Sequence, residues 1–187
     1  MRRMETQLAT TQSVVASLRS LLERPAAPIT VTHRVETKLR AAGISGQVPF
    51  PGLDIWLSAA QREIDAALAT AAVPPEGPRA ALYSAECFQL GVGIVTAYVP
   101  ATQDVLSSGR TKMLEIPAAE LAVAVHRGPL GDLDQTYGAL GTYVAEREIG
   151  VDGPIREHYL ITEFDTDDES SHITEVCWPV FQTAPSS

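Results

Sequence analysis

The sequence predicts an α+β fold in which a βαββ unit occurs twice, forming one pseudo-two-fold antiparallel sheet with helices on one face. A coiled-coil-type helix precedes it. Three observations support this: the order strand, helix, strand, strand appears twice, short motifs recur at offsets between 76 and 79 residues, and the first 24 residues follow a heptad pattern. The 187 residues, 45% of them apolar, suffice for one domain with an appendage.

The N-terminal segment reads as a helix with a narrow apolar seam. Its seam positions alternate in spacing between three and four residues over three heptads: Met1, Met4, Leu8, Thr11, Val15, Leu18 and Leu22. Pro25 and Pro28 end the helix. Such a helix can lie on its own domain or pair with a second chain, and the heptad spacing favours pairing. We therefore expect a dimerisation and linker helix over 1–25 and one domain over 26–187.

The first unit spans about 28–100. Alternating apolar residues predict a strand around 29–35, and helical spacing predicts a helix over 53–72. Two strand-like runs follow, 80–88 and 93–99, with a glycine turn between them.

The second unit spans about 112–182 and repeats that order. Alternation predicts a strand over 121–125, and an apolar stripe predicts a helix over 133–144. The runs 155–164 and 173–180 are typical of a β-hairpin.

The recurrence extends to short motifs. The segment 77–83 begins Gly-Pro and ends in Tyr, as does 153–159. In that alignment the position of Glu157 corresponds to Ala81. A second similarity is that Val95-Thr96 and Val99-Pro100 line up with Ile173-Thr174 and Trp178-Pro179. A duplicated unit accounts for both similarities.

The charge distribution limits the partners of the chain. The net charge is −9, which argues against nucleic acid as a partner of the whole chain, although the first forty residues carry seven basic groups against three acidic ones. The sequence contains no apolar run long enough to cross a membrane and no signal-peptide pattern, and its two cysteines form no disulfide framework. We expect a cytoplasmic protein.

The residues that could bind a metal ion or perform catalysis give no recognisable pattern. None of the four histidines shares metal-ligand spacing with a cysteine or carboxylate, so we expect structural histidines and no metal. The acidic run 165–169 lacks the glycine and glutamate of a calcium loop, with Ser170 and Val176 in their places, which leaves an exposed hairpin tip. No nucleophile elbow or phosphate-binding loop is present. We expect no cofactor and no catalytic residues.

Several motifs together resemble a known family. They are Leu-Glu-Ile-Pro-Ala at 114–118, Val-His-Arg-Gly-Pro at 125–129, Gly-Pro to Tyr at 153–159, Thr174-Glu175 and Pro179. In this order they resemble the gyrase-inhibitor-like (GyrI-like) effector-binding domain, over about 28–182. The junction at 18–29 is similar to the one that follows the dimerisation helix in multidrug-responsive regulators of the MerR family.

The resemblance implies a ligand groove between the two units that takes lipophilic, cationic or aromatic molecules. In the regulators, binding is transmitted to an N-terminal DNA-binding domain. No helix-turn-helix precedes the helix in this sequence, so it implies an effector-domain fragment or a free-standing ligand binder. The expected partners are a small molecule, a second copy through 1–25, and DNA only through a domain outside this sequence. The alternatives are a hydrolase of cyclopropane-containing toxins and a protein that binds another protein or sequesters drugs.

Two carboxylates are the candidate charged contacts. The resemblance implies that Glu157 faces the groove and meets the positive charge of the ligand. The residues alone favour a surface glutamate paired with Arg156 or with an arginine on the next strand. Glu175 either lines the groove beside Glu157 or forms hydrogen bonds to the backbone across the sheet.

The aromatic residues are few, so their positions are informative. Core packing is the default role of any one of them. We nevertheless predict that Trp56, Tyr137 and Trp178 reach the ligand, together with Tyr83 and Tyr159 on the two equivalent strands.

Overall fold

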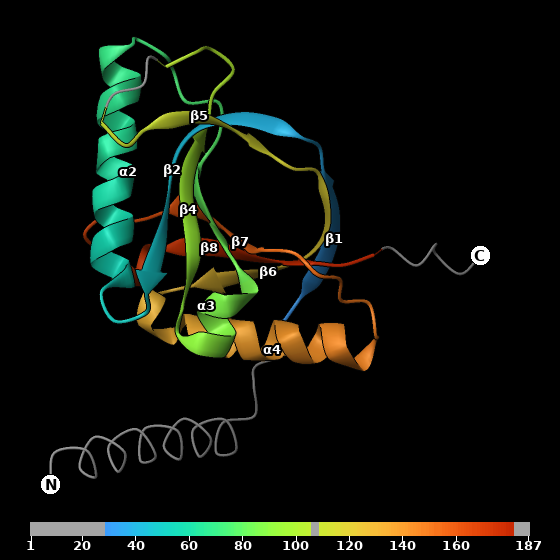
Figure 1. The fold of residues 1–187 in the computed structure, drawn as a ribbon. Coiled ribbons are helices and arrows are strands. Elements are labelled where there is room, and N and C mark those ends of the chain that lie inside the picture. The colour runs from blue at the N-terminus through green and yellow to red at the C-terminus, as the bar shows by residue number, and fades with distance from the viewer. Residues whose placement is uncertain (1–28, 106–108, 182–187) are drawn as a thin grey trace, which may run out of the picture.

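The computed structural model describes residues 29–105 and 109–181 (Figure 1). The heptad helix predicted over 1–24 lies outside these ranges. The strands are β1 (Val31–Glu36), β2 (Leu39–Pro49), β3 (Arg79–Tyr83), β4 (Val92–Pro100), β5 (Lys112–Ile116), β6 (Ala119–Arg127), β7 (Ile155–Ile161) and β8 (Ile173–Pro179). The helices are α2 (Leu53–Thr70), α3 (Ala85–Leu90) and α4 (Leu133–Glu146), with short 3-10 turns at Leu130–Asp132 and Glu169–Ser171.

The strands form one antiparallel sheet in the order β1-β6-β8-β7-β3-β4-β2-β5. The counterparts in the two units are β1 and β5, β2 and β6, β3 and β7, and β4 and β8. Exchanging each strand for its counterpart gives the same order read in reverse, so the sheet has a pseudo-two-fold axis between β3 and β7. In that pair Ala81 lies directly opposite Glu157. The predicted α+β fold with a duplicated unit is confirmed, and the axis passes beside the candidate carboxylate.

Each unit begins with two strands, and one of the two pairs within the half of the sheet that belongs to the other unit. β1 pairs with β6 of the second unit, whereas β2, two residues later, pairs with β4 of its own unit. β5 pairs with β2, and β6 then returns to the second unit. Each unit therefore lends one strand to the other.

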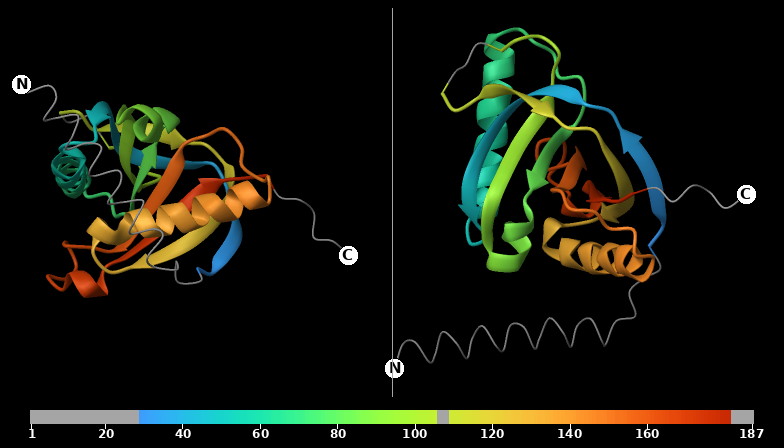
Figure 2. Two further views of the ribbon diagram at one scale, coloured as in Figure 1. Left: turned by 90° about the horizontal axis from the view of Figure 1, so that it is seen from below. Right: turned by 45° about the vertical axis from the view of Figure 1, so that its right-hand side comes forward.

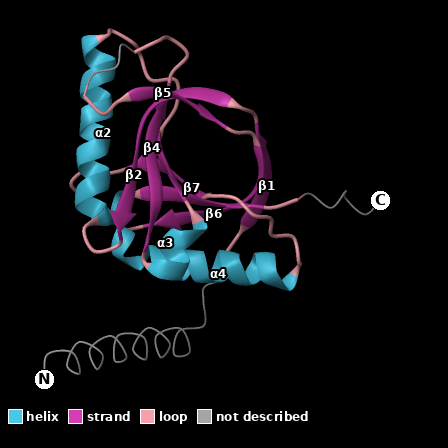
Figure 3. Ribbon diagram, in the orientation of Figure 1, coloured by secondary structure: helices cyan, strands magenta, loops and turns pink. Residues whose placement is uncertain are grey.

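The helices lie on the outer face of the curved sheet, and the inner face is left uncovered by them (Figures 1 and 2). α2 buries Ile64 and Leu68 against β2 and β4, and α4 buries Leu140 and Val144 against β6 and β8. A Cβ atom at Gly46 of β2 would lie 3.1 Å from the ring of Trp56, so glycine lets α2 approach the sheet. Helices and sheet form two layers (Figure 3). The two apolar clusters that include residues of α2 and α4 lie between these layers.

The largest local difference from the sequence prediction is α3. The apolar run 80–88 was expected to be one strand, but β3 ends at Tyr83 and residues 85–90 form a helix. Ser84 occupies the N-cap position and Gly91 adopts a left-handed conformation (φ 69°) at the C-terminus, so the chain turns twice within a short segment. Short apolar runs do not separate strand from helix by periodicity.

The strands β2 and β5 were also missing from the sequence prediction. The middle of β2 is Ala-Ala-Gly-Ile-Ser-Gly, which has little intrinsic preference for a strand. In the part of the chain that the structure describes, no helix is long and apolar enough to cross a membrane.

Candidate ligand-binding site

The centre of the candidate site is the carboxylate of Glu157, which projects from β7 toward the helices. Its side chain is buried, with 6% of the residue exposed. Tyr137 of α4 donates a hydrogen bond of 2.5 Å to Oε1, and Tyr159 donates one of 2.6 Å to Oε2. The hydroxyl of Tyr83 lies 3.2 Å from Oε2 and 2.7 Å from the hydroxyl of Tyr159. Three of the predicted site residues therefore meet at Glu157.

The duplicated unit explains why two of these tyrosines meet. Tyr83 and Tyr159 occupy equivalent positions on β3 and β7, and the axis between these strands brings their hydroxyls together. The carboxylate itself has no counterpart, because Ala81 stands at the equivalent position. Tyr83 and Tyr159 are therefore related by the axis, whereas the negative charge comes from the second unit only.

Among residues 29–105 and 109–181, no arginine or lysine pairs with Glu157. Its carboxylate instead accepts hydrogen bonds from tyrosines. Burial raises the pKa of Glu157 above its usual value, although the hydrogen bonds from Tyr137, Tyr159 and Tyr83 act in the opposite direction. Burial and the adjacent carboxylate raise the pKa of each tyrosine well above its usual value, so the hydroxyls remain donors.

Aromatic side chains from two other segments cover the tyrosines. The ring of Phe88 on α3 lies 5.4 Å from that of Tyr137 and 6.3 Å from that of Tyr83, and Phe50 packs edge-on against Phe88 at 5.8 Å. Both phenylalanines are about 40% exposed, with Phe50 at 39% and Phe88 at 43%. Sequence reasoning missed them because it placed Phe88 at the end of a strand. The pair Ser84 and Gly91 was the signal for the short helix.

A cavity of about 540 Å³ adjoins Phe88 between α3 and α4. Its apolar wall includes Trp178, Ile155 and Phe88, and its lining also includes Glu148 and Asp152. The volume is in the range of cavities that hold drug-sized molecules. The cavity therefore combines an apolar wall with acidic groups.

The two tryptophans take different positions. Trp178 packs on the helix side of the sheet near Gly141 of α4 and lines this cavity. Trp56 lies on α2 over β2, among the apolar residues that also contact Tyr83 and Tyr159. Neither forms part of the hydrogen-bond cluster at Glu157, so their contact with a ligand stays a prediction.

Glu175 is not brought together with Glu157. It projects from β8 to the inner face of the sheet, where Arg34 donates a hydrogen bond of 2.8 Å to Oε2 and the Nδ1 atom of His158 lies 3.2 Å away. Burial alone would raise the pKa of Glu175, but these bonds hold it below its usual value. Neither expectation for Glu175 describes this arrangement: it does not lie beside Glu157, and the partners it has across the sheet are the side chains of Arg34 and His158 and not the backbone.

Arg156, proposed from the residues alone as a surface partner of Glu157, is buried on the inner face and pairs with Glu36 at 3.0 Å. His126 is buried and bonded to Thr136 and the Pro129 carbonyl, each at 3.0 Å, as a structural histidine would be.

The acidic run lies in the loop between β7 and β8, as the predicted hairpin tip requires. Asp168 accepts a hydrogen bond from the backbone of Ser170 and is exposed.

Family comparison agrees with this arrangement. Residues 94–180 match the family model of the GyrI-like small molecule binding domain. The similarity that the sequence motifs predict is confirmed over this range. No significant match occurs among curated protein sequences.

Solved structures extend the GyrI-like similarity to the whole sheet. The EcmrR–DNA complex matches with a TM-score of 0.68 at 17% identity over 97% of this chain and 70% of that chain, and the EcmrR C-terminal domain with 0.67 at 16% over 84% and 100%. SAV2435 bound to tetraphenylphosphonium matches with 0.58 at 13% over 81% and 94%. A hydrolase encoded by lin2189 from Listeria innocua matches with 0.58 at 12% over 87% and 97%. EcmrR is a MerR-family regulator, and at these identities the similarity shows a shared fold.

Proposed function

We propose that this GyrI-like domain is the effector-binding part of a transcription regulator and binds a lipophilic cation at Glu157. The single observation that carries the proposal is a buried carboxylate that has no arginine or lysine partner among the described residues and is surrounded by aromatic side chains. An ionised carboxylate in such a place is costly, and a ligand with a delocalised positive charge would relieve that cost. Each aromatic face beside the cation would contribute about 0.5–2 kcal/mol.

The cavity beside α3 supports the same ligand class. Its wall of Trp178, Ile155 and Phe88 suits an apolar body, and Glu148 and Asp152 attract positive charge. Because Glu157 is only 6% exposed, a ligand that reaches it must move Phe88 or the whole of α3. The solved complex of SAV2435 with tetraphenylphosphonium shows that this fold accepts such a cation in another protein.

The regulatory part of the proposal rests on the similarity to EcmrR, whose solved complex contains DNA. We infer that ligand binding favours one arrangement of the domain relative to its N-terminal helix, so that a pre-existing equilibrium shifts. In this proposal the heptad helix over 1–25 joins two copies in the cytoplasm, and DNA is contacted only by an N-terminal domain outside this sequence.

Calorimetric titration with tetraphenylphosphonium tests the proposal. Glu157→Gln removes the charge and keeps the shape, and we expect it to weaken binding by about 2 kcal/mol or more, roughly 30-fold. The matched control is Glu175→Gln, on the other face of the sheet, which should change the affinity less than about threefold. Equal affinities of the wild type and Glu157→Gln would refute the role of Glu157.

A hydrolase is the second candidate, favoured by the Listeria innocua relative and by the raised pKa of Glu157. A carboxyl group with a raised pKa can act as a general base toward water. Incubation with a cyclopropane-containing electrophile distinguishes the two functions. Product that depends on Glu157 supports the hydrolase, whereas stoichiometric binding without product supports the sensor.

A further inference from the structure

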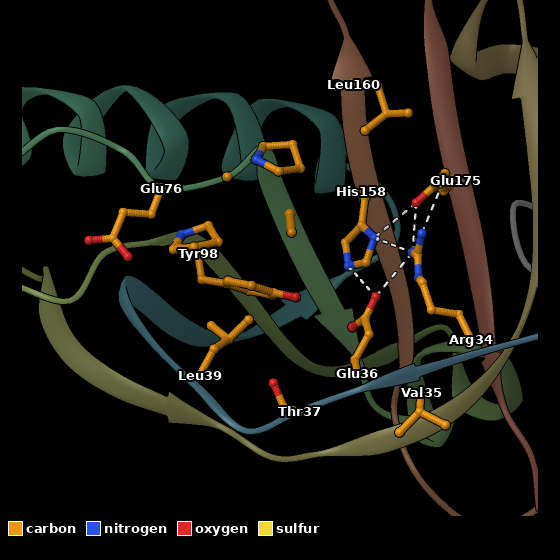
Figure 4. A pocket seen from close by; sticks show the side chains of 14 residues that line it. Arg34, Val35, Glu36, Thr37, Leu39, Glu76, Tyr98, His158, Leu160 and Glu175 are labelled. Atoms are coloured by element: carbon orange, nitrogen blue, oxygen red, sulfur yellow. Dashed lines mark hydrogen bonds and ion pairs between the residues drawn. The ribbon is translucent and has the colours of Figure 1, made fainter.

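The inner face of the sheet holds a second cluster of charged and polar side chains, at one end of a cavity of about 540 Å³ (Figure 4). Arg34 and Glu36 reach it from β1, His158 from β7 and Glu175 from β8. Cys177, two residues after Glu175, lies beneath them and is fully buried. The helices lie on the opposite face, so this cluster is separate from Glu157.

Three atoms of this cluster are of the types that bind transition metals. The Nδ1 atom of His158, a carboxylate oxygen of Glu175 and the Sγ atom of Cys177 all lie within 4.8 Å of one another. Nδ1 is 3.2 Å from Oε2 of Glu175 and 3.8 Å from Sγ. Tetrahedral zinc with ordinary bond lengths separates a nitrogen from an oxygen ligand by about 3.3 Å and from a sulfur ligand by about 3.5 Å. The observed separations are close to these.

A cation already stands over the three atoms. The Nη2 atom of Arg34 lies 2.8 Å from Glu175 Oε2, 3.1 Å from His158 Nδ1 and 3.8 Å from Cys177 Sγ. A guanidinium group only donates hydrogen bonds. In the tautomer with the ring hydrogen on Nδ1, His158 donates to Glu175; in the tautomer with the hydrogen on Nε2, Nδ1 accepts from Arg34. Nε2 faces Oε1 of Glu36 at 3.7 Å. The tautomer with the hydrogen on Nε2 directs the Nδ1 lone pair at the cation, with a carboxylate behind the ring as metal-binding histidines have.

We propose that His158, Glu175 and Cys177 bind one divalent metal ion of the zinc class, which takes the place of the Arg34 guanidinium. The exchange keeps the charge of the cluster unchanged. The metal adds two positive charges, while the thiol releases one proton to solvent and Arg34 removes one positive charge as it leaves. Glu36 keeps its ion pair with Arg156 at 3.0 Å.

The surroundings allow this exchange. Arg34 lies on β1 at the edge of the sheet and its side chain is 39% exposed, so it can turn into solvent. Its buried Nε atom has no hydrogen-bond partner among the described residues, so one donor of the guanidinium group is unsatisfied in this position. His158 and Glu175 line the cavity, which leaves a fourth coordination position for water or a ligand.

Calorimetric titration of the metal-free, tag-free full chain with Zn²⁺ tests the proposal. We expect one Zn²⁺ per wild-type chain. Arg34→Ala removes the competing cation and should tighten binding by about tenfold or more, which corresponds to about 1.4 kcal/mol. His158→Ala should abolish binding.

Titration with Co²⁺ identifies the ligands without deleting any of them, because a cobalt–thiolate bond gives a charge-transfer absorption. We expect that band in the wild type and in the matched control Cys87→Ser, whose cysteine lies near Ser84 on α3, and its loss in Cys177→Ser. The proposal is overturned if the wild type binds no Zn²⁺, if Zn²⁺ binding persists in His158→Ala, or if Co²⁺ binds without the thiolate band.

Discussion

The two faces of the sheet carry carboxylates in opposite electrostatic surroundings. On the helix side Glu157 is held by three tyrosine hydroxyls and has no ion pair among the described residues. On the inner side Glu175 and Glu36 are matched by two arginines. On the inner face the two carboxylates have counter-charges within the fold. On the helix side the carboxylate of Glu157 has none among the described residues, so its negative charge is available to a cationic ligand.

The largest expected effect on stability comes from removing the charge of Glu36 on the inner face. Glu36 binds Arg34 and Arg156, each at 3.0 Å, and Arg156 is only 2% exposed. Glu36→Gln leaves the Arg156 charge buried without a counter-charge, so we expect a loss of about 3 kcal/mol in the free energy of unfolding. Urea unfolding at neutral pH measures it.

The matched control for Glu36 is Glu115→Gln. Glu115 pairs with Lys38 at 3.1 Å, and both side chains are more than 60% exposed, so its loss should cost less than about 0.5 kcal/mol. Equal effects of the two substitutions would contradict the contrast between a buried and an exposed pair.

A smaller effect of opposite sign is expected on the outer face. Glu157→Gln removes an unpaired buried charge, and the tyrosine hydroxyls can rotate to accept from the amide. We expect a gain of about 1 kcal/mol or more in the free energy of unfolding at pH 8, alongside the loss of ligand binding.

The pH dependence sharpens that prediction. The folded pKa of Glu157 is raised above 4.5. At a pH between 4.5 and the folded pKa, the folded state therefore holds a proton that the unfolded state has lost. Wild-type stability therefore falls as pH rises from 4.5 through the folded pKa, and the advantage of Glu157→Gln should vanish below this window. An advantage that is the same at pH 4 and pH 8 would refute this account.

The smallest effect belongs to Glu175, whose pKa is lowered. Its contribution is present above pH 4.5 and is lost as pH falls through the folded pKa, which is the reverse of Glu157. Because the ion pair with Arg34 is partly exposed, Glu175→Gln should cost about 1 kcal/mol or less at pH 7 and nothing at low pH. If the effects of Glu157→Gln and Glu175→Gln on the free energy of unfolding changed with pH in the same direction, the distinction between the two faces would be wrong.

Much of the fold could be predicted from the sequence because periodicity and repetition are local signals. The helices α2 and α4 and the hairpin of β7 and β8 follow directly from their apolar patterns. The strand β2 could not be predicted, since its small residues become a strand only through pairing with β4 and β5 on both sides. Tertiary pairing overrode weak local preference there.

The candidate site was predictable where it depends on the repeat and not where it depends on register. The alignment of Tyr83 with Tyr159 already placed both tyrosines at equivalent positions. The contact between His158 and Glu175 arises from the register of β7 and β8, which no spacing along the chain reveals. Sequence spacing therefore indicated only scattered histidines, although His158 lies beside a carboxylate and a thiol.

The exchange of first strands between the units has a consequence for how the chain comes to be folded. Val31 of β1 pairs with Ala124 of β6, so β1 leaves the ribosome before its partner strand is made. Neither unit can complete its part of the sheet alone, because each would lack a strand that the other supplies. The duplicated unit therefore persists in the sequence as a repeat but not as two separable folding units, and Arg34 reaches Glu175 only after both units have joined.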